Sequence, residues 1–370
     1  MRKQSRSTPP FRADQVGSFL RPKHLLEARA RRERGEISAA DLQEIEDASI
    51  EELVAKQESI GLETASDGEF RRTFWHFDFL EQLDGVEKYE ASQGIQFKGG
   101  QTKAWGLKVN SKLDFSESHP MLRHFRFLKE HCKVVPKMTI PSPSVLHFRG
   151  GRKAVSTDVY PSMDEFYDDL AGAFLKAVNA FAAEGCRYLQ LDEVNFTYLC
   201  DPDQREMLKA RGDDPDALPE IYAFMINKAI SEIPSDMVVS MHLCRGNFKS
   251  MWIGSGGYEP VAETLFNAIN VPGYFMEYDT DRAGGFEPLR FVPKDKVVVL
   301  GLVTSKHGTL ESKDELKRRI DEAAKFIDLD QLCLSTQCGF ASTEEGNVLT
   351  EDEEWAKMER VVEVAREVWG

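Results

Sequence analysis

Short apolar runs alternate with amphipathic segments along most of the chain. Eight of the apolar runs have the length and the glycine, proline or polar boundaries of strands. Two of them end at 16–19 and 65–69, and the others span 134–140, 188–192, 237–244, 274–278, 296–303 and 332–335. Segments with helical spacing separate most of these runs, at 38–60, 162–184, 218–233, 260–269, 312–327 and 351–368.

Continuous apolar strands that alternate with helices indicate a parallel sheet buried on both faces. Eight such units favour closure of the sheet into a barrel, which places every strand between two neighbours. We therefore predict an α/β protein with a single (β/α)8 TIM barrel over residues 1–370, of which 1–11 form an N-terminal tail.

One segment departs from the alternation. Residues at about 84–114 contain four glycines, Gly94, Gly99, Gly100 and Gly106, and show the pattern of a hairpin. We expect an inserted hairpin after the second unit of the barrel. The chain has no low-complexity tract, and no linker divides it into two domains.

Composition agrees with a barrel and limits the partners. The 370 residues exceed the size of most single domains, but a TIM barrel needs ~250 residues before insertions. With 47 basic and 62 acidic residues, the net charge of −15 disfavours binding to nucleic acid or to anionic membranes. No apolar window is long enough for a membrane span, and the basic N-terminus lacks the apolar stretch of a secretory signal.

Six cysteines without paired spacing are too few for a disulfide framework. Together with the missing signal, they favour a reduced, cytoplasmic environment, in which thiolates are free for metal binding or catalysis.

Polar residues recur where the predicted strands end, which is where the active sites of such barrels lie. Packing explains any one of them, but not their repetition at the same rim. The residues are Ser18, Asp67, Glu69, Asp192, His242, Cys244, Glu277, His307 and Cys338.

His242 and Cys244 form the sharpest local signal. They lie two residues apart on one predicted strand, so their side chains point to the same side. For this pair alone, a core histidine beside a buried cysteine is the ordinary interpretation. Glu277 and Cys338 end the sixth strand and follow the eighth, and a His, Cys, Cys and carboxylate set suits Zn²⁺. The four residues together favour a zinc site.

These residues resemble the catalytic barrel of cobalamin-independent methionine synthase. The matching pieces cover about 12–368 in the expected order, and they are VGSFLRP, SDGEF, LQLDE, MHLCRGNF, MEYD, TSKHGT and STQCGF. The resemblance implies a catalytic zinc held by His242, Cys244, Glu277 and Cys338. Full-length members of that family carry a second, N-terminal barrel that this chain lacks, as in short single-barrel relatives.

The resemblance also implies that Ser18, Glu69 and Asp192 bind the amino-acid end of homocysteine. Independent chemistry agrees, because an ammonium pairs with carboxylates and a carboxylate pairs with backbone donors such as those around Ser18. His307 is suggested as the acid that protonates the leaving group of the methyl donor. The alternative for His307 is a solvent-exposed loop histidine beside Lys306.

The methyl-donor side departs from the family. The tryptophan on which the family stacks the pterin ring is absent from residues 139–144. The aromatic stretch 71–79 is the alternative donor pocket, with Trp75 and His76 as its candidates and Arg71 facing an anionic tail such as polyglutamate. Helix packing with solvated arginines is the competing interpretation.

We therefore predict a zinc-dependent homocysteine S-methyltransferase in methionine biosynthesis. Its donor is 5-methyltetrahydrofolate, with or without a polyglutamate tail, or another methyl donor. The substrates are small molecules, no nucleic acid or membrane is involved, and a homo-oligomer remains open.

Three alternatives remain at this point. One is another zinc-dependent thiol alkyltransferase, such as an enzyme that adds a thiol to an epoxide. A second is a metal-free lyase of the porphyrinogen decarboxylase type, and the third is a non-enzymatic zinc-binding barrel.

Overall fold

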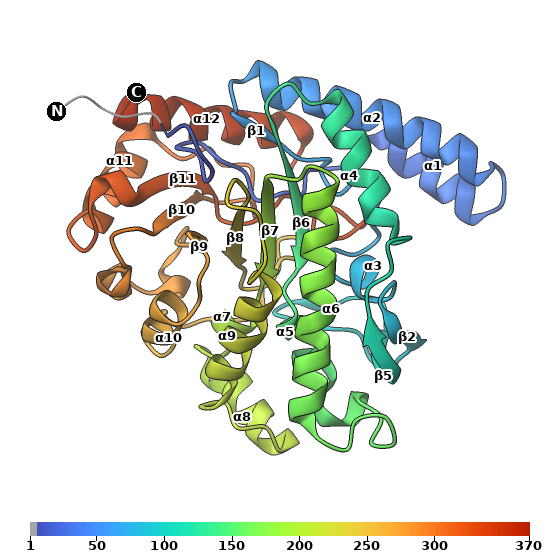
Figure 1. The fold of residues 1–370 in the computed structure, drawn as a ribbon. Coiled ribbons are helices and arrows are strands. Elements are labelled where there is room, and N and C mark those ends of the chain that lie inside the picture. The colour runs from blue at the N-terminus through green and yellow to red at the C-terminus, as the bar shows by residue number, and fades with distance from the viewer. Residues whose placement is uncertain (1–5) are drawn as a thin grey trace.

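The computed structural model describes residues 6–370, and its centre is one parallel sheet (Figure 1). Seven strands follow one another in the order β1, β6, β7, β8, β9, β10 and β11. Their bounds are Thr64–Ala65, Val135–Pro141, Tyr188–Glu193, Val238–Leu243, Gly273–Glu277, Val297–Val303 and Leu332–Thr336. These are seven of the eight predicted strands, and each lies within a residue or two of its expected bounds, apart from the short β1.

The eighth predicted strand closes the ring between β11 and β1. Ala13 bridges Leu334 of β11 in parallel, and Ser18 bridges Gly68 just after β1. Between these bridges Gly17 adopts φ +135°, where a Cβ would lie 2.6 Å from Thr139 Cγ2. The segment therefore touches both neighbours without forming a regular ladder, and the fold is that of a TIM barrel.

The inside of the barrel is filled by side chains of alternating strand residues. Val16, Tyr188, Phe275, Val297, Val299 and Cys333 form a buried cluster there. The period of two between Val297 and Val299 turns both toward this interior. Residues between them face outward and join the larger apolar core under the helices.

Helices surround the sheet on its outside (Figure 1). The longer ones are α1 (Lys23–Glu33), α2 (Ala39–Ser59), α4 (Pro120–His131), α6 (Met163–Ala183), α8 (Pro202–Arg211), α9 (Leu218–Ala229), α11 (Lys313–Ala323) and α12 (Glu351–Trp369). Shorter ones are α3 (Phe77–Leu80), α5 (Ser144–Gly150), α7 (Asn195–Tyr198) and α10 (Ala262–Asn267). The six predicted helices are present, and Ser38 and Asp41 form a capping box at the start of α2.

Residues 84–114 form antiparallel structure outside the barrel. Strand β2 (Asp84–Glu90) pairs with β5 (Trp105–Asp114), and the short β3 (Gln96–Phe97) pairs with β4 (Gly100–Gln101). The Phe97 ring packs 5.3 Å from that of Phe248, and the backbone N–H of Lys98 donates to Trp252 O at 2.8 Å. The inserted segment 84–114 therefore contacts the loop that follows β8.

The last residue of the predicted N-terminal tail packs against the barrel. Residues 1–5 of the predicted tail lie outside the described residues. Phe11 is buried, and its ring meets that of Tyr188 edge to face at 6.4 Å.

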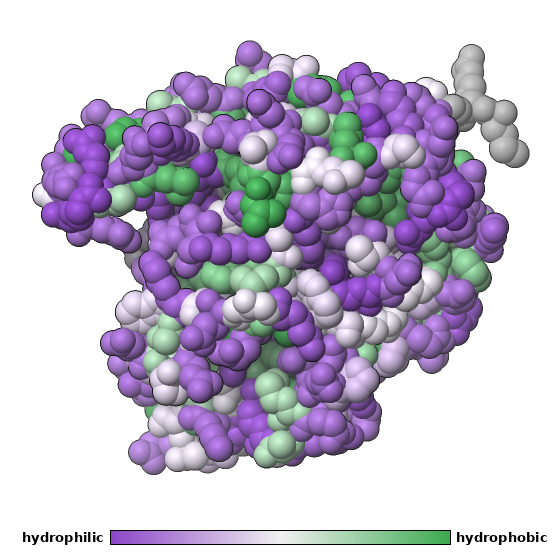
Figure 2. Space-filling view, turned by 180° about the vertical axis from the view of Figure 1, so that it is seen from behind, coloured by the Kyte–Doolittle hydropathy of each residue, from purple (hydrophilic) through white to green (hydrophobic). Residues whose placement is uncertain are grey.

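The face opposite to Figure 1 is mostly hydrophilic, with apolar side chains in small separate groups (Figure 2). No helix between residues 6 and 370 combines the length and apolarity that a membrane crossing requires.

Candidate active site

One cavity opens where the strands of the barrel end. Six of the polar residues that the sequence places at strand ends line it together: Ser18, Glu69, Asp192, His242, Cys244 and Cys338. They come from opposite sides of the ring, so barrel closure brings together residues up to about 320 positions apart in the chain.

The four predicted metal ligands form one compact group. His242 lies on β8 and Cys244 directly after it, Glu277 is the last residue of β9, and Cys338 follows β11. One ligand atom from each residue lies within 4.8 Å of the others, and all four side chains are buried. The two sulfur atoms are 3.4 Å apart. Parallel strands that end at the same rim account for this convergence.

The two cysteines influence each other's protonation. The hydrogen bond between their sulfurs raises the pKa of Cys244 well above its ordinary value, and burial adds to that effect. The same bond holds the pKa of Cys338 well below its ordinary value. Burial pulls the pKa of His242 down, but attraction to Cys338, Asp192 and Glu277 outweighs it and leaves the pKa raised. The two thiols are therefore unequal, and Cys338 is the more readily ionised of the two.

The group fits a zinc ion by its chemistry. Both ring nitrogens of His242 are buried without a hydrogen-bond partner. Burial of these polar atoms is unfavourable unless a ligand such as a metal ion binds to the ring. Two thiols, an imidazole and a carboxylate are borderline-soft donors that suit Zn²⁺ in fourfold coordination. These four residues could therefore hold zinc.

Glu277 has partners besides its fellow ligands. Its Oε1 accepts a hydrogen bond from the backbone N–H of Arg245 at 2.6 Å. Its Oε2 lies 3.2 Å from Arg282 Nη2, in an ion pair. Neither arginine was singled out from the sequence, although Arg245 immediately follows Cys244.

Two buried carboxylates lie on the other side of the cavity. Glu69 has φ +60°, an uncommon and strained backbone conformation for a residue with a side chain. Its Oε1 accepts from Thr139 Oγ1 at 2.8 Å and pairs with Arg72 at 3.3 Å. Its Oε2 is buried without any partner. The carboxylate of Asp192 accepts from Gln190 Nε2 at 2.7 Å.

The positive charges near these two carboxylates do not offset the effect of burial on their pKa values. Burial raises the pKa of Asp192 to about 7, and the nearby charge of Glu69 adds to the shift. Burial also raises the pKa of Glu69, although Arg72 opposes it. An incoming ammonium group would satisfy the free oxygen of Glu69 and stabilise both ionised forms.

Ser18 lies beside the segment that follows β11. Its Oγ accepts from the backbone N–H of Ala341 at 3.3 Å. A Cβ on Gly339 would lie 2.1 Å from this oxygen, so only glycine allows the close approach.

The three candidates for the methyl-donor pocket lie in different surroundings. Trp75 lines the cavity. Arg71 instead pairs with Glu46 and Asp47 on α2, at 3.2 and 2.5 Å, and does not line the cavity. His76 is fully buried among aromatic rings and has no hydrogen-bond partner on either ring nitrogen.

The loop after β10 presents its residues differently from expectation. His307, the predicted acid, is exposed to solvent and does not line the cavity. Its neighbour Lys306 is buried, and its Nζ lies 3.2 Å from Gly246 O in the loop that carries Cys244. Sequence reasoning missed Lys306 because this residue follows the strand, where the period of two no longer fixes the direction of a side chain.

Asp192→Asn is expected to stabilise the fold at neutral pH. The ordinary pKa of 3.8 describes the unfolded chain, and the folded carboxyl titrates near 7. Below about pH 4 both states are protonated, so Asp192 has no effect on stability. Between about pH 4 and 7 only the unfolded state ionises fully, so stability falls with rising pH, at ~1.4 kcal/mol per pKa unit. Above pH 7 the loss is constant.

Thermal unfolding in the presence of a chelator measures this effect. We expect the midpoint of Asp192→Asn to exceed that of the wild type by several degrees at pH 8, and by clearly less at pH 5. A difference that is the same at both pH values would show that the Asp192 carboxyl has no raised pKa.

Comparison with known proteins identifies the family. Residues 11–367 match the family described as "Cobalamin-independent synthase, Catalytic domain". The chain belongs to the cobalamin-independent methionine synthase family. This membership supports methyl transfer to homocysteine as the type of reaction.

Individual relatives within this family cover nearly the whole chain. "Uncharacterized protein YxjH" of Bacillus subtilis is 52% identical over 97% of this chain and 95% of its own length. A methionine synthase of Pyrococcus abyssi is 24% identical over 88% of this chain and 84% of its own length. A solved Listeria monocytogenes structure, described as a "Putative Vitamin-B12 Independent Methionine Synthase", is 41% identical to this chain with a TM-score of 0.79. The match covers 99% of this chain and 100% of that one.

Proposed function

We propose that this member of the family is a zinc-dependent methyltransferase that converts homocysteine to methionine. The observation that carries the proposal is that one cavity holds both kinds of group that the reaction needs. His242, Cys244 and Cys338 line it together with the Glu69 and Asp192 carboxylates, and Glu277 completes the cluster within 4.8 Å of the other three ligands.

The amino-acid end of homocysteine has a matching set of partners. Its ammonium would pair with Glu69 Oε2, which is buried and unpartnered, and with Asp192. Its carboxylate would meet Ser18 and the backbone around it. These contacts would position the side chain of the substrate with its sulfur toward Cys244 and Cys338.

The sulfur end is the side of the metal ligands. Zinc, when bound, lowers the pKa of a coordinated thiol, so that the thiol reacts as a nucleophilic thiolate. Of the four residues that would hold the zinc, Glu277 is the one that could leave room for a substrate sulfur, because its carboxylate also has the Arg245 N–H and Arg282 as partners.

The methyl donor would approach from the side of Trp75. A methyl-folate, polyglutamylated or not, is the donor that we propose first, and another methyl donor is the alternative. The leaving amine takes up a proton, which we assign to His307 on the loop after β10. His307 would act from its exposed position only if this loop turned toward the cavity.

An activity screen tests the function. Zinc-loaded protein is incubated with homocysteine and with 5-methyltetrahydrofolate bearing one or three glutamates, methylcobalamin or an S-methyl compound, and methionine is measured. We expect methionine from at least one donor and none from chelator-treated protein. Zinc-loaded protein that forms no methionine with any donor, and binds no homocysteine, would contradict the proposal.

A further inference from the structure

Lys306 differs from the other buried lysines of the protein in its lack of a carboxylate partner. Among residues 6–370, three lysines are buried: Lys137, Lys306 and Lys357. Lys137 pairs with Asp14 at 3.1 Å, and Lys357 pairs with Glu311 at 3.0 Å. Lys306 has only neutral acceptors, Gly246 O at 3.2 Å, Asn247 Oδ1 at 3.4 Å and Met251 O at 3.5 Å. A buried ammonium without an anion is unfavourable, so an anionic ligand that binds nearby would stabilise Lys306.

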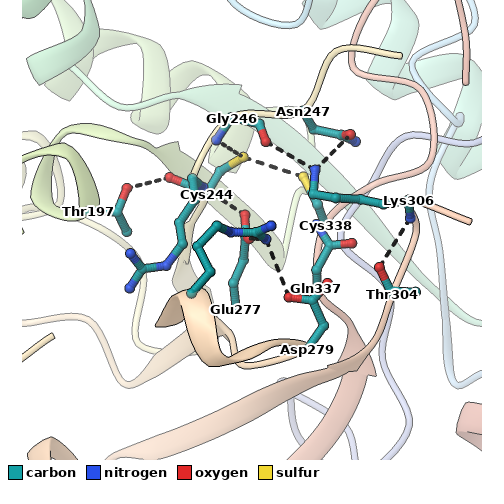
Figure 3. A network of polar contacts seen from close by, with 12 residues as sticks. Thr197, Cys244, Gly246, Asn247, Glu277, Asp279, Thr304, Lys306, Gln337 and Cys338 are labelled. Atoms are coloured by element: carbon teal, nitrogen blue, oxygen red, sulfur yellow. Dashed lines mark hydrogen bonds and ion pairs between the residues drawn. The ribbon is translucent and has the colours of Figure 1, made fainter. Parts of the chain in front are cut away.

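The ammonium lies beside the ligand cluster. Figure 3 shows Lys306 reaching from the loop after β10 toward Gly246 and Asn247, next to Cys338. Its charge acts on Cys244, Glu277 and Cys338 and favours the ionised form of each. Lys306 thus supplies a fixed positive charge next to the place of the substrate sulfur.

Two other cations lie near the cluster. Arg282 pairs with Glu277 and with Asp279, at 3.2 and 3.4 Å. The guanidinium of Arg245 is buried over the Tyr258 ring at 4.5 Å, and its three nitrogens have no hydrogen-bond partner. Lys306 differs from both because its ammonium lies against the loop that carries Cys244, 3.2 Å from Gly246 O, without a carboxylate partner.

The proposed reaction changes the charge at this place. Two thiolates and a carboxylate around a divalent cation carry a net charge of −1, and a substrate thiolate adds another negative charge. Once the sulfur is methylated it becomes a neutral thioether. A nearby ammonium attracts the thiolate and is indifferent to the thioether.

We propose that Lys306 is a positioning residue that makes the site prefer the homocysteine thiolate to the methionine thioether. The inference rests on the proposed function. By this preference Lys306 helps the substrate to bind and the product to leave, without contacting the methyl group.

The test compares two ligands that share the same amino-acid end. Calorimetry measures the affinities of the zinc-loaded protein for homocysteine and for methionine, so that contacts to Ser18, Glu69 and Asp192 cancel in the ratio. Lys306→Met should lower the ratio of homocysteine to methionine affinity about tenfold, as expected for the loss of one nearby charge. Lys306→Arg should retain the ratio.

Lys296→Met is the matched control. Lys296 lies just before β10, at the other end of that strand, and also donates to backbone carbonyl oxygens, including Phe266 O at 2.7 Å. This variant should leave the ratio unchanged.

Two results would overturn the inference. If Lys306→Met lowers the affinities for homocysteine and methionine equally, Lys306 has only a structural role, in holding the two loops together. If neither affinity changes, its charge is irrelevant. Failure of the wild type to bind homocysteine at all would instead overturn the proposed function.

Discussion

Cys338→Ser is expected to abolish zinc retention and methionine formation together. Zinc sites of four ligands have apparent binding free energies of ~10–16 kcal/mol, or roughly 3 kcal/mol for each ligand. Loss of one thiolate should therefore weaken zinc binding about 100-fold or more. Within the ligand group found among residues 6–370, the only other thiol is that of Cys244, 3.4 Å away, which is already a ligand in this assignment. Zinc content after dialysis and methionine formation measure both effects.

Cys333→Ser is the matched control for this change. Cys333 is buried on β11, five residues before Cys338, but belongs to the cluster inside the barrel and not to the ligand group. We expect it to retain zinc and activity. Activity and zinc that survive in Cys338→Ser would show that the ligand assignment is wrong.

Glu69→Gln is expected to weaken homocysteine binding about 100-fold, the effect of removing one partner from a buried charge pair. The amide keeps the shape of the side chain and its contact with Thr139, but loses the negative charge that would face the ammonium. Affinity for a simple alkanethiol sulfonate, which has no ammonium, should stay within about twofold of the wild type. Titration calorimetry with both thiols measures the difference.

This comparison also separates the proposed function from a thiol alkyltransferase that uses other thiols. Such an enzyme has no need of an ammonium site, so Glu69→Gln would affect both thiols alike. A loss of affinity for both would contradict the homocysteine assignment. Unfolding midpoints show whether the variant, which also leaves Arg72 without its partner, remains folded.

The convergence of the four candidate ligands could be predicted because the strands fix where three of them lie. His242 lies on β8 and Cys244 directly follows it, and Glu277 ends the neighbouring β9. Parallel strands of a closed barrel end at the same rim, so the order of residues along the chain was enough. The predicted strands succeeded for the same reason, since each is a compact apolar run.

Residues outside regular strands were harder to place. Arg71 lies shortly after the second strand of the chain, but it forms ion pairs with two carboxylates of α2. No local sequence pattern predicts that these residues meet. His307 and Lys306 are adjacent, and the backbone of the loop decides which one turns inward.

Three of the longer helices, α1, α4 and α8, were not among the six predicted helical segments. Helix α1 buries only Leu25 and Ala28, so its charged surface conceals the helical pattern. Helix α4 buries four residues at helical spacing, Met121, Leu122, Phe125 and Leu128, so its signal was present in the sequence.

X-ray absorption at the zinc edge can decide whether homocysteine binds to the metal through its sulfur, because it counts the sulfur atoms around the zinc. We expect two sulfurs in the zinc-loaded protein, from Cys244 and Cys338, and three after homocysteine is added. A sulfur count that stays at two in the presence of saturating homocysteine would contradict this binding mode.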